Sequence, residues 1–274
     1  LGYHDKVLLP TYDVFDEKRY FNSSSNIQPY DISLNGKAIK IGVQICEDLW
    51  DQNYDLSVSD ELIRKGAEMM INISASPYRK SIIDKRIKLC KDRAKDLKYY
   101  FIYCNMVGAQ DELVFDGRSF ILSADGKKKL LAKMFKQEIL DFDFNQPSNN
   151  KDIQVSSNFS EEIFKALRTG VSDYFSKTNF RKAIIGLSGG IDSALTAALV
   201  SEAIGPENVY GISMPSQFSS EHSKDDARSL ADNLGINFEI VPINDVFDEF
   251  LNHMDVFFKD TQAGLAEENL QARI

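Results

Sequence analysis

The sequence contains few of the residues that mark disulfide-rich or zinc-binding proteins. Its 274 residues include three cysteines, three histidines and one tryptophan. Cys46, Cys90 and Cys104 cannot all pair with one another, and their spacing matches no zinc-binding pattern. We therefore expect reduced thiols and a cytoplasmic protein.

Long apolar runs and basic clusters are also missing. No stretch has the length and apolarity of a membrane-spanning helix, and no signal peptide or internal repeat is visible. The net charge is −9, whereas non-specific binding to nucleic acid or to a membrane surface requires basic patches. We expect no nucleic-acid partner and no membrane partner. The negative net charge does not exclude phosphorylated small molecules as ligands, because backbone amides at the start of a helix can bind them.

Short apolar runs separated by polar segments fill the first half of the sequence and are typical of β-strands. The expected strands are Ala38–Ile45, Met69–Ile73, Tyr99–Asn105, Ser119–Ser123 and Glu138–Phe142. Asp84–Lys98 has the pattern of a charged amphipathic helix, and Ala124–Lys127 has that of a hairpin turn. These elements predict a layered α/β domain over residues 1–145.

A polar, proline-bearing segment that starts at Asn145 predicts a linker, which we place at residues 146–157. A second domain is expected over residues 158–274. Asn158 and Glu161 are spaced like a capping box that opens a helix to about Ser176. The elements that follow alternate between strand and helix: Ala183–Leu187, Ile191–Ala203, Val209–Met214, Ser220–Leu234 and Phe238–Val241. This alternation predicts a doubly wound parallel sheet.

Cys46 is the first candidate for catalysis. It ends the apolar run Ile41–Ile45 and is followed at once by two acidic residues. A strand that ends in cysteine is a suitable place for a nucleophile, yet a lone cysteine is more often a small apolar core residue. Cys90 lies in an expected helix and Cys104 in an expected strand, so only a structural role is expected for these two.

Three further sequence blocks accompany the cysteine block, and together they indicate a family. They are Lys6–Phe21, Asn72–Tyr78 and Gly108–Ser119. In this order, the four blocks resemble the amidase domain of the nitrilase superfamily, most closely the glutaminase half of the NAD synthetases. The resemblance covers residues 1 to about 145 and implies an α-β-β-α fold, which we expect to be incomplete here.

The family resemblance implies a Glu–Lys–Cys triad in which Cys46 is the nucleophile and Lys6 the lysine. These roles fit the chemistry, because a thiolate attacks an amide best beside a base and a positive charge. The general-base glutamate of the family lies well upstream of the lysine, so we expect it outside this chain, which begins at Leu1 without Met. Glu17 resembles a supporting second glutamate.

The same resemblance implies a glutamine pocket. Tyr12 and Ser76 match positions that bind glutamine in the family. A third position, usually basic, falls near Ile82, so the sequence departs from the pattern there, and Lys80 is expected to compensate. The alternative for Tyr12 and Glu17 is a packed loop with no catalytic role. Glu112, Asp116 and Arg118 are expected to shape the site and the domain contacts, with a solvated loop as the alternative.

A glycine-rich loop between an expected strand and helix is the second motif. It comprises Gly186, Leu187, Ser188, Gly189, Gly190, Ile191, Asp192 and Ser193. Glycines allow close approach to an anion, and the helix N–H groups and the two serines can donate to phosphate. Asp192 suits a site that holds Mg²⁺ with ATP. No Gly-Lys-Ser/Thr follows, so the loop is not a Walker A motif.

The Ser188–Ser193 motif resembles the pyrophosphate loop of the ATP-pyrophosphatases. That family cleaves ATP between the α and β phosphates and includes GMP, argininosuccinate, asparagine and NAD synthetases. The resemblance implies ATP binding by the loop and by Met214, and deamido-NAD binding by Asn269 and Arg273. An ordinary solvated helix face is the alternative for the Glu267–Arg273 segment.

The combined resemblance implies a glutamine-hydrolysing NAD synthetase that uses glutamine, ATP, Mg²⁺ and deamido-NAD and forms a homo-oligomer. Two alternatives stay open: another glutamine amidotransferase of the ATP-pyrophosphatase family, and a non-catalytic nucleotide-binding module. Because family members continue past Ile274, we expect the synthetase domain to be incomplete here and the chain alone to be inactive or nearly so.

Overall fold

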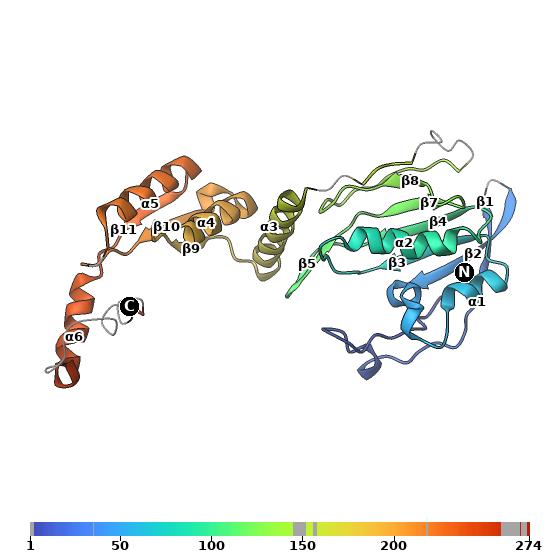
Figure 1. The fold of residues 1–274 in the computed structure, drawn as a ribbon, viewed down its shortest axis with the longest axis horizontal. Coiled ribbons are helices and arrows are strands. Elements are labelled where there is room, and N and C mark those ends of the chain that lie inside the picture. The colour runs from blue at the N-terminus through green and yellow to red at the C-terminus, as the bar shows by residue number, and fades with distance from the viewer. Residues whose placement is uncertain are drawn as a thin grey trace. The chain divides into compact units, whose positions relative to one another are not determined.

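The computed structural model describes residues 3–34, 36–144, 152–155, 158–217, 219–258, 269 and 273–274. It divides into two compact units, Leu1–Ala166 and Leu167–Ile274. Figure 1 shows the elements of each unit. Among the described residues, no helix has the length and apolarity needed to cross a membrane.

A six-stranded mixed sheet organises the first unit. Its strands, in spatial order, are β1 (Tyr30–Leu34), β2 (Lys37–Ile45), β3 (Met69–Ser74), β4 (Tyr100–Asn105), β7 (Phe120–Ser123) and β8 (Lys128–Leu131). The three central strands β2, β3 and β4 are parallel, and the outer pairings are antiparallel. Because β2, β3 and β4 run the same way, the residues that follow them meet at one edge of the sheet.

Two helices cover one face of this sheet (Figure 1). Helix α1 (Val58–Arg64) packs on β2, and helix α2 (Ile82–Ala94) packs on β4 and β7. Leu62, Met70, Phe101 and Phe120 are fully buried in the cluster between helices and sheet. Strand residues alternate between the two faces, so Ile73 points away from this cluster and is 55% exposed.

Two smaller features complete the first unit. Strands β5 (Val107–Gln110) and β6 (Leu113–Asp116) form an antiparallel hairpin of their own. Short 3-10 helices occupy Glu17–Arg19, Cys46–Leu49 and Asp51–Asn53. Residues 152–155 lie within the expected linker, and there the Asp152 carboxylate accepts a hydrogen bond from the Lys128 backbone N–H at 2.8 Å.

Most of the expected elements of this unit are confirmed. Strands β2, β3, β4 and β7, helix α2 and the β7–β8 hairpin turn lie where the sequence predicts them, within a few residues. The expected strand at Glu138–Phe142 is wrong. Phe142 instead packs edge-on against Tyr100 at a ring-centre distance of 5.2 Å. The Glu138 carboxylate accepts from the Lys133 N–H, so this segment is held by side chains and not by a strand ladder.

The second unit is built on a three-stranded parallel sheet. The strand order is β11 (Asn237–Ile240), β10 (Val209–Ser213), β9 (Ala183–Gly186). Its helices are α3 (Phe159–Thr178), which begins in the first unit, α4 (Ile191–Ile204), α5 (Glu221–Leu234) and α6 (Asn244–Phe258).

Leu187, Ala197 and Val209 are buried in the core between α4, α5 and the sheet. The expected alternation of parallel strands and helices is confirmed. The expected helix start also holds, since the Asn158 side chain accepts from the Ser160 and Glu161 N–H groups.

A buried ion pair links helix α2 to strand β6 in the first unit. The Arg86 guanidinium donates to both carboxylate oxygens of Asp116, at 2.8 and 3.0 Å, and the two side chains are 0% and 1% exposed. Arg86 also donates to the backbone oxygens of Ser76 and Pro77. A single guanidinium therefore fixes a helix, a hairpin and the loop that follows β3.

We predict that Arg86→Met lowers the free energy of unfolding by about 3–5 kcal/mol, because it leaves the Asp116 carboxylate buried without its partner. Urea unfolding of the variant measures the loss. The double variant Arg86→Met, Asp116→Leu should regain part of it. Arg64→Met, which breaks an exposed pair with Glu61, is the matched control and should leave the midpoint unchanged. An unchanged midpoint for Arg86→Met would contradict the structural role.

Candidate active site

Cys46 lies in a strained turn directly after β2. Its backbone φ is +47°, in the left-handed region that non-glycine residues seldom adopt. The strand ends at Ile45, and a 3-10 helix runs from Cys46 to Leu49. A strained residue at a strand end is a recurring way to present a nucleophile. The structure thus places Cys46 directly after a strand, where the sequence predicts it.

The surroundings of the Cys46 thiol act on its pKa in opposite directions. Burial raises the pKa, whereas a hydrogen bond from the Ala75 N–H, the positive charge of Lys6 and a contact with Ser74 lower it. Ala75 directly follows β3, the parallel neighbour of β2. The net pKa stays above its usual value, so Lys6 offsets only part of the cost of burying a thiolate.

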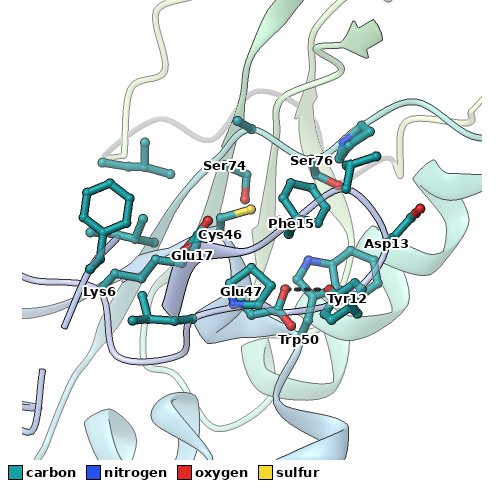
Figure 2. Close-up of a pocket in the computed structure, with 18 of the residues that line it drawn as sticks. Lys6, Tyr12, Asp13, Phe15, Glu17, Cys46, Glu47, Trp50, Ser74 and Ser76 are labelled. Atoms are coloured by element: carbon teal, nitrogen blue, oxygen red, sulfur yellow. Dashed lines mark hydrogen bonds and ion pairs between the residues drawn. The ribbon is translucent and has the colours of Figure 1, made fainter. Parts of the chain in front are cut away.

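Lys6 and Glu17 form a close ion pair beside the thiol. The Lys6 ammonium donates to both Glu17 carboxylate oxygens, at 2.7 and 2.5 Å. Figure 2 shows both side chains grouped with Ser74 and Glu47 around the Cys46 sulfur. The carboxylate of Glu17 orients the ammonium, which matches a supporting role better than that of a base acting on the thiol.

A cavity of about 1020 Å³ opens over Cys46. Its lining includes five of the six residues expected for catalysis and glutamine binding: Lys6, Tyr12, Glu17, Cys46 and Ser76. The sixth, Lys80, is absent from the lining, and its ammonium lies 4.2 Å from the centre of the Phe159 ring. The neighbouring Arg79 lines the cavity instead. The structure therefore places Arg79, and not Lys80, at the cavity.

Ser76 is held from two sides at the wall of this cavity. It is 5% exposed, and its N–H donates to the Asn105 side-chain oxygen at 2.9 Å. The Arg86 Nε–H donates to its hydroxyl oxygen at 3.2 Å. The sequence singled out Ser76 but not Arg86, because nothing in the pattern of an amphipathic helix distinguishes a buried arginine from a solvated one.

Glu47, the residue after the cysteine, forms part of the cavity that sequence reasoning left without a role. Its carboxylate accepts hydrogen bonds from the Tyr12 hydroxyl at 2.8 Å and the Tyr54 hydroxyl at 3.0 Å. Burial raises the pKa of Glu47, and the two tyrosines oppose the rise. Burial and the nearby Glu47 charge raise the pKa of Tyr54 to about 12. The cavity thus contains an acidic position one residue from the thiol.

The block around β6 is only partly a solvated loop. Asp116 and Arg118 are 1% and 5% exposed, whereas Glu112 is exposed. Arg118 donates to the Glu162 carboxylate at 2.7 Å, and the Tyr78 hydroxyl donates to the other oxygen of the same group at 3.2 Å. The solvated-loop alternative is therefore wrong for Asp116 and Arg118.

The glycine-rich loop of the second unit joins β9 to α4. Gly189 has a φ of +79°, and a Cβ there would lie 2.4 Å from the Ser223 carbonyl oxygen. The Ser188 and Ser193 hydroxyls are 3.2 Å apart, and the Gly190 N–H donates to the Ser188 hydroxyl at 3.2 Å. Leu187 is buried, but Ser188 and Gly190 are exposed and Ser193 is half-buried, so the two hydroxyls and the N-terminus of α4 can be reached by an anion.

The remaining expected ligands of the second unit lie in different places. The Met214 methyl lies 3.5 Å from the position that a Cβ on Gly186 would take, so Met214 is beside the start of the loop. Arg273 donates to the Asn269 carbonyl oxygen at 2.9 Å, and both residues are exposed. Within the described residues, no group of three or more metal-ligating side chains occurs. Asp192 therefore contributes a single carboxylate to the loop.

Comparison with known families matches the two halves of the chain separately. Residues 1–146 match the carbon-nitrogen hydrolase family, and residues 163–274 match the NAD synthase family. The first match covers more than half of the chain, so the chain belongs to the carbon-nitrogen hydrolase family. Its fold, a nitrilase-type unit followed by a unit with a parallel sheet, is the one expected from the sequence.

Some relatives align with nearly the whole chain, across both matched regions. The chain is 43% identical to the glutamine-dependent NAD(+) synthetase of Synechocystis sp. over 98% of this chain and 50% of the relative. It is 38% identical to that of Thermotoga maritima over 100% of this chain and 53% of the relative. The solved structure of the Acinetobacter baumannii glutamine-dependent NAD+ synthetase in complex with ADP superposes with a TM-score of 0.87 at 35% identity, over 100% of this chain and 51% of that one. The chain spans about half the length of the curated relatives it matches.

We predict that Lys6→Met slows alkylation of Cys46 by iodoacetamide about three- to tenfold at pH 8. The thiolate is the reacting form, and loss of the Lys6 charge raises the thiol pKa further above its usual value. The thiolate fraction at a fixed pH below the pKa therefore falls. Mass spectrometry of the Cys46 peptide across pH 6–10 measures the rate. Lys80→Met is the control and should not change it; an unshifted profile for Lys6→Met would show that the two groups do not interact.

Proposed function

We propose that the protein to which this chain belongs is a glutamine-hydrolysing NAD synthetase. It releases ammonia from glutamine and uses ATP to convert deamido-NAD to NAD, with AMP, pyrophosphate and glutamate as the other products. The observation that carries the proposal is the group formed by the Cys46 thiol and the Lys6–Glu17 ion pair in one cavity. The match of residues 163–274 to NAD synthases supports deamido-NAD as the acceptor of the ammonia.

The first unit would perform the glutaminase reaction. The Cys46 sulfur attacks the side-chain carbonyl carbon of glutamine, and the proton lost by the thiol passes to the departing nitrogen. The C–N bond breaks, ammonia leaves and a thioester remains. Water then attacks the thioester and releases glutamate. The Lys6 ammonium favours the thiolate and stabilises negative charge that develops beside it. The Ala75 N–H, which lowers the pKa of the thiol, would help to hold the thiolate.

The second unit would activate the acceptor. Ammonia cannot displace oxide from a free carboxylate, so the carboxylate is adenylated first. The nicotinate carboxylate of deamido-NAD attacks the α-phosphate of ATP and displaces pyrophosphate. AMP then leaves when ammonia attacks the acyl-adenylate. The Ser188 and Ser193 hydroxyls and the first N–H groups of α4 would bind the departing pyrophosphate.

Magnesium fits this loop as a companion of ATP. Mg²⁺ in such sites is held by one or two carboxylates together with the phosphates of the substrate. The exposed Asp192 carboxylate in the first turn of α4 is suited to that role. Met214 would contact ATP, and Asn269 and Arg273 would contact deamido-NAD. Homo-oligomer formation and a cytoplasmic location stay predictions of the family resemblance.

The charges of the cavity suit the two ends of an amino acid. Of its cationic lining residues, Lys6 is paired with Glu17, whereas the exposed Arg79 guanidinium makes no hydrogen bond or ion pair within the described part of the chain. Arg79 would bind the α-carboxylate of glutamine, and Glu47 would bind the α-ammonium. Tyr12 and Ser76 line the same cavity.

We predict that Cys46→Ala in the full-length protein lowers glutamine-dependent NAD formation by at least about 1,000-fold, because the covalent nucleophile is lost. NAD formation from added ammonium should persist, since it needs only the synthetase reaction. Parallel assays of NAD with glutamine and with ammonium chloride measure both. Cys104→Ala, which replaces the exposed cysteine of β4, is the control and should be unaffected. Continued glutamine-dependent synthesis in Cys46→Ala would exclude Cys46 as the nucleophile.

We predict that Arg79→Ala lowers kcat/KM for glutamine by about 10- to 100-fold, the loss expected for a hydrogen bond to a charged group. Hydrolysis of 4-aminobutanamide, which is glutamine without its α-carboxylate, should be unchanged. Glutaminase assays with both amides measure the difference. Lys80→Ala removes the adjacent cation outside the cavity and should change neither rate. Equal losses with both substrates would contradict carboxylate recognition by Arg79.

A further inference from the structure

We propose that Asp48 is a positioning residue that fixes the Lys6 segment against the Cys46 turn and so sets the approach of the ammonium to the sulfur. The proposal rests on the proposed roles of Lys6 and Cys46. It assigns to Asp48 no contact with substrate.

The Asp48 carboxylate joins two parts of the chain that are 40 residues apart in sequence. One oxygen accepts from the backbone N–H groups of Val7 and Leu8, at 3.1 and 2.8 Å. The other accepts from the N–H of Ile45 at 2.9 Å. The donors on one side directly follow Lys6, and the donor on the other directly precedes Cys46. One carboxylate therefore connects the backbone next to Lys6 with the backbone next to Cys46.

Burial makes this connection a rigid one. The Asp48 side chain is 0% exposed, so water does not compete for its three donors. Its backbone oxygen accepts from the Gln44 amide at 3.1 Å, and the same amide donates to Ser59 in α1. The anchor is thus itself held to β2 and to a helix. A buried carboxylate satisfied by backbone donors keeps its geometry better than an exposed one.

The Lys6 segment depends on such an anchor because residues 3–10 belong to no helix or strand. Serine contacts hold its carbonyl side: the Ser24 N–H donates to the Lys6 oxygen, and the Ser23 hydroxyl donates to the Val7 oxygen. Its N–H side is bound by Asp48. Burial of Val7 and Leu8 keeps the segment on the core, whereas the carboxylate fixes its register relative to Cys46.

Asp48→Asn tests the proposal with little change in shape. The amide retains one oxygen, but its NH₂ group must face a backbone N–H on one of the two sides, so one half of the connection is lost. We expect alkylation of Cys46 by iodoacetamide at pH 8 to slow three- to tenfold and its pH profile to move upward, as in Lys6→Met. In the full-length protein, kcat for glutamine should fall more than KM changes.

A double-variant cycle separates positioning from a general loss of structure. In a Lys6→Met background, Asp48→Asn should cause no further slowing, because the group through which it acts is already absent. Asp51→Asn is the matched control: Asp51 is also buried, but its carboxylate binds Ser57 and Arg93 and has no hydrogen bond or ion pair with the described residues 3–10. It should leave the alkylation profile unchanged.

Two results would overturn the proposal. One is wild-type alkylation in Asp48→Asn, and the other is equal slowing with and without Lys6, which would mean that Asp48 acts on the cysteine turn alone. If Asp48→Asn does not fold, Asp48→Glu carries the same test, because it keeps the charge and moves the oxygens by one methylene. Alkylation does not require glutamine turnover, so a wild-type protein without glutaminase activity would refute the proposed function and leave this test intact.

Discussion

The parallel pairing of β2 with β3 and of β3 with β4 is the constraint on which the first site depends. It brings three chain segments to one edge of the sheet: the Cys46 turn after β2, Ala75 and Ser76 after β3, and Asn105 at the end of β4. Each supplies something different. The first supplies the thiol, the second the Ala75 N–H that lowers the pKa of the thiol, and the third an amide oxygen that accepts from the Ser76 N–H. An antiparallel arrangement would place these groups at opposite edges.

Both units place their candidate site residues between a strand and the helix that follows it, but the two turns differ in backbone conformation. In the first unit, a non-glycine residue is held at positive φ so that its side chain is presented. In the second, Gly189 has a positive φ, and the chain there also passes too close to Ser223 for a side chain. The first turn thus presents a thiol, and the second leaves the Ser188 and Ser193 hydroxyls close together beside the start of α4.

Much of this could be predicted from the sequence, and the failures have physical reasons. Strands β2, β3 and β4 are apolar runs bounded by polar residues, and the Ser188–Ser193 loop has a distinctive composition, so both were predictable. The apolar run at Glu138–Phe142 carries the same pattern, yet aromatic packing on Tyr100 takes the place of a strand partner. Arg79 and Lys80 are indistinguishable in sequence, and only the path of the chain after β3 decides which one lines the cavity.

The contact between Arg86 and Ser76 has a consequence for the wall of the cavity. Because the Arg86 Nε–H donates to one lone pair of the Ser76 hydroxyl, that hydroxyl keeps its own hydrogen and a second lone pair for other partners. An arginine outside the cavity lining thus fixes how a serine in the cavity wall is presented.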